Sequence, residues 1–345
     1  MIELRQDQLV FSFPDVHPQA KLSMDFQRTL RIPDDDKTYP LPPGLGRFPL
    51  RHVDDFAETV PASWVEHGGV MFPMFQSEAL WLCLHADYVT QQGAYPFAIK
   101  VATGKIDAVT GKDWSQGLHR GPQDYMVAPR QPWLDGYCVE KGVIRQFVAM
   151  PLGAGYSAEE QITGKAEHGG LQIIAYPMKA EVFERRFPRI NRRVGDGDPS
   201  GHLEALSYTL SAPRCLSMGL APGGRMKQEI YEDPFDLSDW DLDHSSRCFV
   251  HLANSLHWRA ITGEASPTMP PTAKQYSQAG LPWFDYYDEA SKPVHGSGIL
   301  AKLKSVLGMG KAKGEQLLPE NQTCEPKKTV KLRPRGKDEV REGVF

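Results

Sequence analysis

The chain of 345 residues is 41% hydrophobic, and its 39 basic and 43 acidic residues give a formal net charge of -4. It is therefore long enough to bury a large core in one or two domains. The balanced charge excludes a global field that would collect nucleic acid or anionic lipid, so no nucleic-acid partner is expected.

The cysteines and the start of the sequence indicate a reducing compartment. Five cysteines stand far apart with no C-x-x-C pair, which favours free thiols over a disulfide framework. The first residues, MIELRQDQLVFSF, lack the pattern of a secretory signal, and no apolar run approaches the ~18 residues of a membrane span. We therefore expect a cytoplasmic protein.

Short strands are predicted along most of the chain, because alternating or apolar runs are repeatedly broken by the 28 prolines and 31 glycines. Thr103-Gly104 and Lys141-Gly142 separate neighbouring runs and predict tight hairpins. The predicted strands are residues 9–13, 22–30, 79–85, 97–101, 105–109, 124–128, 137–140, 143–150, 171–176, 206–210, 225–231 and 247–252.

Few helices are predicted, and all are short. Ser157 with Glu160 and Thr272 with Gln275 have the spacing of a capping box, and residues 254–262 form a third candidate. Many short strands with few helices favour an antiparallel β-sandwich or jelly-roll-like fold over residues 1–290. The polar, turn-rich stretch 190–202 leaves a division into two domains open.

The segment GAGYSA, residues 153–158, fits a G-x-G-x-x-A pattern between a predicted strand and a predicted helix. A dinucleotide-binding fold needs a full strand-helix-strand unit, whereas Gly164 and Gly169-Gly170 leave room for only about two helical turns. We interpret the segment as a connection between strands and expect no cofactor.

No metal site is predicted. His244, His251 and His257 are spaced by seven and six residues, so they share no face of one helix. The run DLSDWDLDH resembles the opening of a calcium loop, but His244 and Val250 stand where that loop requires Gly and Glu.

The glycine segment supports one catalytic hypothesis. The sequence lacks the G-x-S-x-G pattern of a nucleophile elbow and the known contexts of catalytic cysteines. If the protein is a hydrolase, Asp135, His168 and Glu159 or Glu160 would have to converge around residues 153–170 as base, orienting carboxylate and backbone donors.

Two aromatic segments suggest a contact surface. QPWLDGY and GLPWFDYYDE each combine Pro-Trp with acidic residues and tyrosine, a mixture that stacks on ligands while its polar tips stay hydrated. The alternative is that these rings fill the open end of a sandwich. The candidate binding residues are Trp133, Tyr137, Trp283, Phe284, Tyr286 and Tyr287.

The segments QDYMVAPRQPWLDG, VIRQFVAMPLGAGYSAEEQITGK and GGLQI resemble an uncharacterised module of bacterial proteins and of larger multidomain fungal proteins. The likeness covers roughly residues 70–180. It implies a self-contained domain, and no activity, cofactor or catalytic residue comes with it.

Aromatic residues nearly vanish after residue 290, and Lys, Glu, Gly and Pro dominate, so we expect residues 291–345 to form a flexible basic tail. Within it, residues 297–310 predict a short amphipathic helix with Ile299, Leu303, Val306 and Leu307 on one face. Such a helix would gain stability by laying this face on a membrane surface, on a partner protein or on the protein's own sheet.

The sequence therefore leaves two classes of function. The leading hypothesis is a non-catalytic binding or interaction module, because strands and aromatic clusters are plentiful and no catalytic motif is complete. The alternative is a hydrolase at residues 153–170. The ligand and the oligomeric state do not follow from the sequence.

Overall fold

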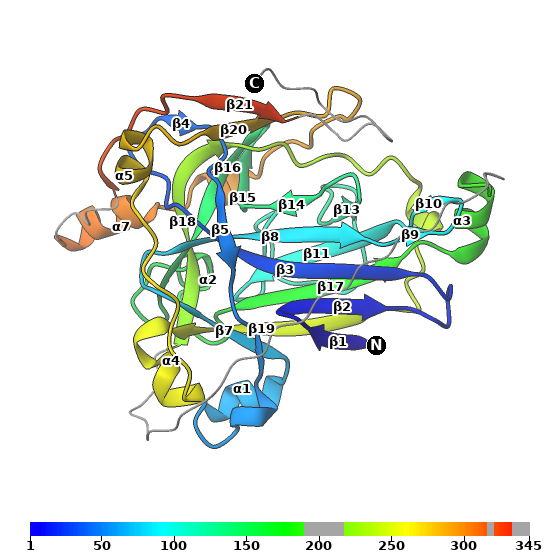
Figure 1. Ribbon diagram of the computed structural model, residues 1–345, viewed down its shortest axis with the longest axis horizontal. Helices are drawn as coiled ribbons and strands as arrows, with labels where there is room; N and C mark the ends of the chain where they lie inside the picture. Colours follow the sequence, from blue (N-terminus) through cyan, green and yellow to red (C-terminus); the bar gives the residue numbers. More distant parts are fainter. Residues whose placement is uncertain (190–216, 316–320, 333–345) are drawn as a thin grey trace.

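The computed structural model describes residues 1–189, 217–315 and 321–332, and every structural statement below concerns those residues (Figure 1). The predicted strand at 206–210, the stretch 190–202 and Cys215 lie outside them. The other four cysteines are free thiols.

The chain is mainly β, as the sequence predicts. Runs in which apolar and polar residues alternate form strands, because the side chains on one face of the strand can be buried while those on the other face contact a second element. The strands are β1 (Ile2–Arg5), β2 (Gln8–Ser12), β3 (Lys21–Thr29), β4 (Thr38–Tyr39), β5 (Gly44–Arg47), β6 (Arg51–His52), β7 (Val70–Met74), β8 (Ala79–Ala86), β9 (Tyr88–Val89), β10 (Gly93–Ala94), β11 (Phe97–Thr103), β12 (Ile106–Asp107), β13 (Met126–Ala128), β14 (Trp133–Leu134), β15 (Gly136–Glu140), β16 (Val143–Pro151), β17 (Leu171–Pro177), β18 (Ser217–Lys227), β19 (Ser246–Asn254), β20 (Trp283–Tyr286) and β21 (Thr329–Leu332).

One large, bent sheet organises the molecule. Its path runs through β1, β2, β3, β8, β16, β18, β19, β17, β11 and β13, with every step antiparallel. β5 pairs with β3, β14 with β8 and β15 with β16, whereas β4 joins β18 and β7 joins β19 in parallel. The long strands β16 and β18 run across the direction of the other strands (Figure 1).

The two ends of this path pack on each other and enclose the core. Phe26 on β3 stacks on Phe72 of β7 with ring centroids 5.0 Å apart, and Phe13 lies 5.7 Å from Phe97 of β11. Because successive strand residues point to opposite faces, Asp25 on β3 lies on the outer side of this layer. That outer face of β3, β8 and β14 carries the candidate site.

The helices are short and lie around the sheet. Both capping boxes are confirmed: Ser157 begins α2 (Ala158–Thr163), and Thr272 begins α5 (Ala273–Gln278). The third predicted helix is α4 (Ser255–Thr262). The helices not predicted are α1 (Ala62–His67), α3 (Ala180–Arg186) and the 3-10 turns Asp54–Phe56 and Leu237–Asp239.

The two predicted hairpins are present. Glu140 pairs with Val143, so Lys141-Gly142 is the loop between β15 and β16. In the first hairpin Thr103 pairs with Ile106, which moves the loop one residue along, to Gly104-Lys105. Both of its residues have positive φ, as a two-residue type I′ hairpin requires.

The C-terminal segment differs from the predicted flexible tail wherever the structure describes it. We call residues 291–315 and 321–332 the C-terminal strap. Its first half holds α6 (Gly298–Ala301) and α7 (Val306–Lys313) in place of one helix over residues 297–310. The side chain of Ser305 caps α7 and ends the continuous helical register.

The strap is attached to the sheet by main-chain hydrogen bonds and by buried apolar groups. The amide of Val294 donates to Ile230 O at 2.7 Å, and the amide of Ser297 donates to Cys138 O at 2.8 Å. Leu300 is fully buried, although the sequence did not single it out. Composition does not predict these contacts, because a few buried apolar residues are enough to hold a segment in place when its backbone is also hydrogen-bonded to the rest of the protein.

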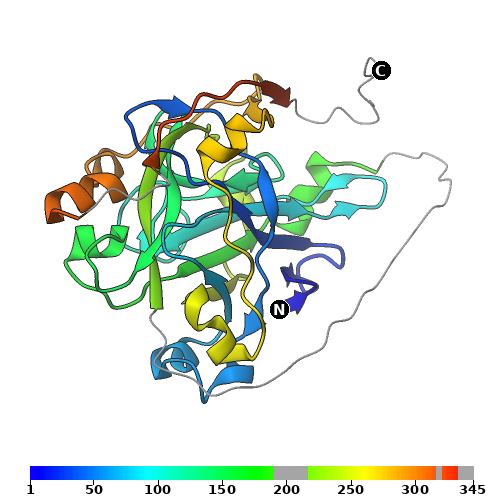
Figure 2. The ribbon, with the colours of Figure 1, turned by 60° about the vertical axis from the view of Figure 1, so that its left-hand side comes forward.

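The apolar face expected of the tail is therefore covered by the protein itself. Leu303 and Val306 are buried, Leu307 is half-buried and Ile299 is 43% exposed. Figures 1 and 2 show β20 and β21 lying with β4 at one end of the molecule. The rest of the predicted tail, residues 316–320 and 333–345, lies outside the described residues.

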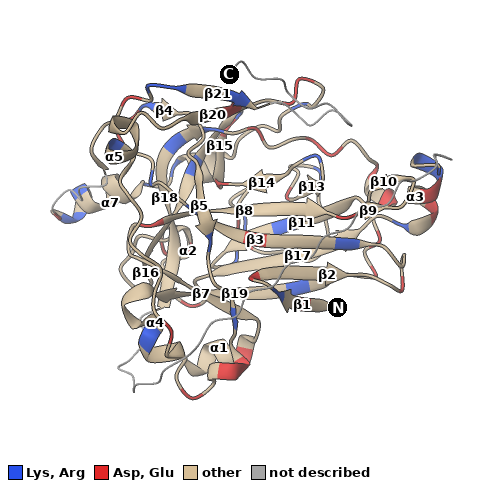
Figure 3. Ribbon diagram, viewed as in Figure 1, with Lys and Arg blue, Asp and Glu red and all other residues tan. Residues whose placement is uncertain are grey.

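The distribution of charged residues and the character of the helices agree with the balanced composition of the sequence. Figure 3 shows basic and acidic residues interspersed over the elements in view, with both signs together on α3. In the described part of the chain no helix has the length and apolar character needed to cross a membrane.

Candidate functional site

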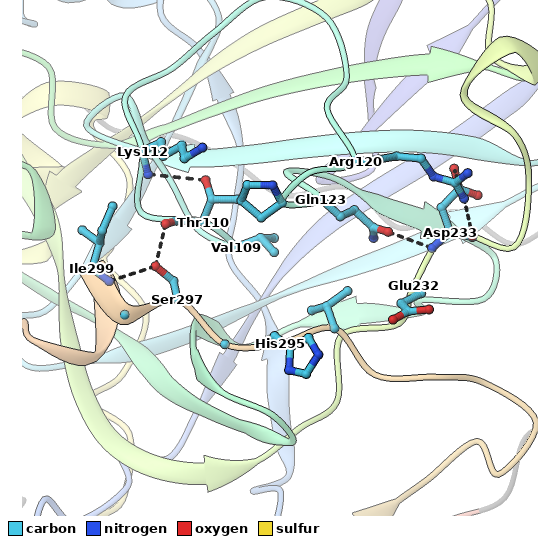
Figure 4. A pocket seen from close by; sticks show the side chains of 14 residues that line it. Val109, Thr110, Lys112, Arg120, Gln123, Glu232, Asp233, His295, Ser297 and Ile299 are labelled. Atoms are coloured by element: carbon cyan, nitrogen blue, oxygen red, sulfur yellow. Dashed lines mark hydrogen bonds and ion pairs between the residues drawn. The ribbon is translucent and has the colours of Figure 1, made fainter.

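One cavity, of about 580 Å³, lies where the strap crosses the chain around residues 109–123. Figure 4 shows its polar groups facing one another. Arg120 donates to Asp233 O at 2.6 Å, the amide of Asp233 donates to Gln123, and the Ser297 hydroxyl donates to Thr110 O at 2.5 Å. The bond from Ser297 to Thr110 joins the two segments, so we interpret the cavity as the seam between strap and sheet.

A smaller cavity, of about 200 Å³, has a different character. It lies on the outer face of the sheet, and we call it the aromatic pocket. All of its lining residues are apolar except one, Asp135. The lining residues are Leu41, Pro42, Pro43, Gly44, Trp81, Trp133, Asp135, Phe284 and Leu332.

Strand register explains why these residues meet. Cys83 on β8 pairs with Asp25 of β3 on one side and with Trp133 of β14 on the other, so all three point to the same outer face. Side chains two residues apart on a strand share a face, so Trp81, two residues before Cys83, and Asp135, two residues after Trp133, also point to that face. The floor of the pocket is thus set by β-sheet geometry.

The walls come from two distant segments that are hydrogen-bonded to each other. The amide of Leu41 donates to Phe284 O at 2.7 Å, and the amide of Phe284 donates to Leu41 O at 2.9 Å. Trp133 packs edge-on against Trp81 at 6.4 Å and against Tyr286 at 4.7 Å between ring centroids. The rings therefore hold one another in place, and the pocket is formed without a ligand.

Asp135 is the polar group of the pocket, and it is buried. Its carboxyl Oδ2 accepts a hydrogen bond from Gln228 Nε2 at 2.5 Å, and its backbone amide donates to Gln228 Oε1 at 3.0 Å. Burial raises the pKa of Asp135 to about 7, and the bond from Gln228 only partly opposes this. Near neutral pH this carboxyl therefore exchanges between its neutral and charged forms.

Asp25 on the same face is also buried, but the charge of its carboxylate is compensated by neighbouring groups. It accepts hydrogen bonds from Gln8 at 2.9 Å and from Gln27 at 2.6 Å, and Arg47 Nε lies 3.3 Å from its Oδ2. The two carboxyl groups thus have different environments: Asp25 has a cation beside it, whereas Asp135 has an uncharged amide.

The six predicted aromatic residues are only partly brought together. Trp133 and Phe284 line the pocket, and Tyr286 supports Trp133. Tyr287 is 43% exposed and is not among the lining residues.

Tyr137 and Trp283 are fully buried, which corrects their assignment to a contact surface. The Tyr137 hydroxyl lies 2.7 Å from Thr103 Oγ1 and donates to Leu220 O, and Trp283 Nε1 donates to Ser277. The correction has a structural cause. The chain changes partner from β8 to β16 between β14 and β15, which takes Tyr137 into the core, as the alternative reading of these rings allowed.

The residues of the hydrolase hypothesis come together only in part, because Glu159 accepts the backbone amide of His168 whereas Asp135 lines the aromatic pocket. In the described part of the chain no hydrogen bond or ion pair joins Asp135 to His168 or Glu159. The Glu159 carboxylate instead accepts the backbone amides of Glu167, His168 and Gly169 at 2.8–2.9 Å, which fixes the turn before β17. Glu160 serves the capping box of α2.

His168 belongs to a group of rings at the other side of the molecule. His67 lies 6.1 Å from His168 and stacks on Phe249 at 4.6 Å, beside a cavity of about 420 Å³. Burial and nearby Lys105 lower the pKa of His168. Among the described residues no group of His, Cys, Asp and Glu is arranged to hold a metal ion.

Comparisons with protein families, with curated proteins and with solved structures found no match to this chain. The resemblance noted in the sequence stays a prediction.

Sequence reasoning missed six of the nine residues that line the pocket. Trp81 sits in a strand that reads as ordinary alternation, and Gly44 and Pro43 read as a turn. Gln228 had no signal at all, because its importance lies in one side-chain pair across 93 positions. The isolated tryptophan in an otherwise aliphatic strand was the one signal that could have found Trp81.

Proposed function

We propose that this protein is a non-catalytic binding protein whose ligand site is the aromatic pocket. The observation that supports the proposal most directly is the combination of Trp81, Trp133 and Phe284 around one buried carboxyl group. Small-molecule sites are characteristically apolar hollows with a few placed polar groups. The ligand would be small and largely apolar, with a single polar or charged group for Asp135.

The preformed walls favour binding. The rings of Trp81, Trp133 and Tyr286 are packed edge to face, and Leu41 and Phe284 are joined by two hydrogen bonds, so little ordering has to accompany ligand entry. The four free thiols agree with the expected cytoplasmic location, which remains part of this proposal.

A ligand-observed NMR screen of small compounds against the full chain tests the proposal, with tryptophan fluorescence as the second readout. Hits should bind the parent protein and lose about tenfold or more in affinity in the Trp133→Ala variant, because a buried aromatic wall is removed. Bound compounds should be recovered chemically unchanged.

Tyr287→Ala is the matched control, since it removes a ring from the same chain region outside the pocket. Its affinity for every hit should equal that of the parent protein. The proposal is wrong if no compound binds, or if hits bind the Trp133→Ala variant as well as the parent.

A further inference from the structure

The carboxyl group of Asp135 lacks a charge partner within the described residues. Its hydrogen-bond partner is the amide of Gln228, and no ion pair includes it. A buried carboxylate without a cation is costly, so such groups are normally paired or neutral. Here the group lines a cavity that is open to a ligand.

The ionisable groups around it do not supply that partner. Arg47 on β5 pairs with Asp25 of β3. Cys83 on β8 is a half-buried thiol whose pKa is raised to about 12, mainly by burial. Asp285 of β20 and Lys331 of β21 are register partners one residue on from Phe284, so they point to the opposite side of this strand pair from the pocket.

The residues that line the pocket restrict the chemical class of its ligand further. A sugar needs hydrogen-bond partners for several hydroxyl groups, and among the described lining residues Asp135 is the only ionisable one, with apolar side chains around it. Aromatic faces attract cations, most strongly where water is excluded. A carboxyl group behind Trp81, Trp133 and Phe284 combines both requirements of an ammonium site.

We propose that the aromatic pocket binds a small organic cation, an alkyl- or methyl-substituted ammonium group, with Asp135 as its counter-ion and the rings of Trp81, Trp133 and Phe284 as its walls. This inference rests on the proposed function and names its ligand class. A permanent positive charge would occupy the inner end of the pocket, and its alkyl groups would contact the rings.

The proposal predicts a characteristic pH dependence. Asp135 must be charged to hold the cation, and its pKa of about 7 leaves it mostly neutral at pH 6 and mostly charged at pH 8. The affinity for a quaternary ammonium, whose own charge does not change, should therefore rise about tenfold between pH 6 and pH 8. Binding at pH 7 should release protons.

The experiment titrates the full chain with tetramethylammonium and with choline, and in parallel with 3,3-dimethylbutan-1-ol, the uncharged carbon analogue of choline. Calorimetry and tryptophan fluorescence give the affinities. At pH 8 we expect choline to bind at least about tenfold more tightly than the alcohol, which corresponds to about 1.4 kcal/mol. The preference should disappear in the Asp135→Asn variant.

Asp25→Asn is the matched control, because it neutralises the other buried carboxyl on the same face but leaves Asp135 intact. It should keep the preference for choline, and thermal unfolding checks that both variants are folded. Equal binding of choline and the alcohol in the parent protein would overturn the ammonium inference and leave the binding pocket standing. If neither the cations nor any uncharged compound of the screen binds in a Trp133-dependent way, both proposals fail.

Discussion

Asp25 and Asp135 share the outer face of one sheet layer, yet Arg47 lies 3.3 Å from the carboxylate of Asp25, whereas among the described residues the side-chain partner of Asp135 is the amide of Gln228. The protein thus keeps one buried acid compensated and leaves the other in an apolar pocket. Such an arrangement lowers stability at a place where a ligand can restore it.

Asp135→Asn should therefore stabilise the free protein at pH 8. The folded state holds the pKa of this carboxyl at about 7, above the ordinary value of 3.8, so between these pH values the folded protein binds more protons than the unfolded chain. The free energy of unfolding then falls as pH rises through this window, by an amount on the order of 2–4 kcal/mol. Thermal unfolding should show a gain for Asp135→Asn at pH 8 that fades towards pH 4. Asp25→Asn should lower stability at both pH values, and a loss of stability in Asp135→Asn at pH 8 would contradict the account.

A second pH effect comes from His251, whose Nε2 lies 3.0 Å from Gly68 O and whose ring stacks on Trp64. Burial lowers its pKa to about 4, so between pH 6.5 and 4 the unfolded chain binds the additional proton. The contribution of His251 to stability is complete above pH 6.5 and declines by up to roughly 3 kcal/mol as pH falls to 4. The neighbouring ionisable group that adds to this shift is His67.

His251→Phe should remove this contribution, so that the variant gains free energy of unfolding relative to the parent protein as pH falls from 6.5 to 4. The ring can still stack between Trp64 and Phe249, but it cannot be protonated. Chemical denaturation at pH 4, 5.5 and 7 measures the difference from the parent protein. His244→Ala, which removes a half-exposed histidine paired with Asp241, should leave the dependence unchanged. Equal slopes for His251→Phe and the parent would assign the acid sensitivity to other groups.

The strap should contribute measurably to stability. Leu300 is fully buried, so Leu300→Ala should cost about 2–4 kcal/mol through lost burial and the cavity left behind. Ile299 is its neighbour with 43% exposure, and Ile299→Ala should cost less than about 1 kcal/mol. Urea unfolding of the two variants compares them directly. Similar small losses in both would mean that the strap leaves the sheet easily.

Gly44 provides a test of the pocket that does not change its charge. An added Cβ would stand 3.3 Å from Trp81 Cζ2, so Gly44→Ala should push the indole aside and narrow the cavity. We expect pocket ligands to bind at least about threefold more weakly, since the indole leaves its optimal contact distance, with the pH profile of binding retained. Gly298→Ala, where an added Cβ meets no atom within 4 Å, is the control and should bind normally. Unchanged affinity in Gly44→Ala would place the ligand elsewhere.

The sequence predicted the β-rich class, most strands, the two hairpins and the capped helices, because each depends on alternation or on a turn or cap within a few residues. Ser157 with Glu160 and Lys141-Gly142 are of this kind. It failed at Tyr137 and Trp283, because their burial depends on which distant strand covers each ring. It failed in the strap for the same reason, since the acceptors Ile230 and Cys138 lie far away in the chain.

Among the residues that line the aromatic pocket, the sequence analysis had named Trp133, Phe284 and Asp135, but it grouped the carboxyl group of Asp135 with His168. Proximity in sequence to a glycine-rich segment suggested that grouping. The register of β14 against β8 instead places Trp133 and Asp135 on the same face as Trp81. Local motifs do not contain that register.

The order of synthesis has a bearing on the pocket. Its floor is encoded by residues 81–135, whereas two of its walls, Phe284 and Leu332, come from the other end of the chain. A nascent chain can therefore pair β3, β8 and β14 long before Phe284 and Leu332 have been synthesised. Until then the rings of Trp81 and Trp133 on the outer face meet solvent, chaperones or neighbouring chains. The aromatic pocket is complete only when residue 332 has emerged and β21 has paired with β20, so its assembly depends on a segment far along the chain from its floor.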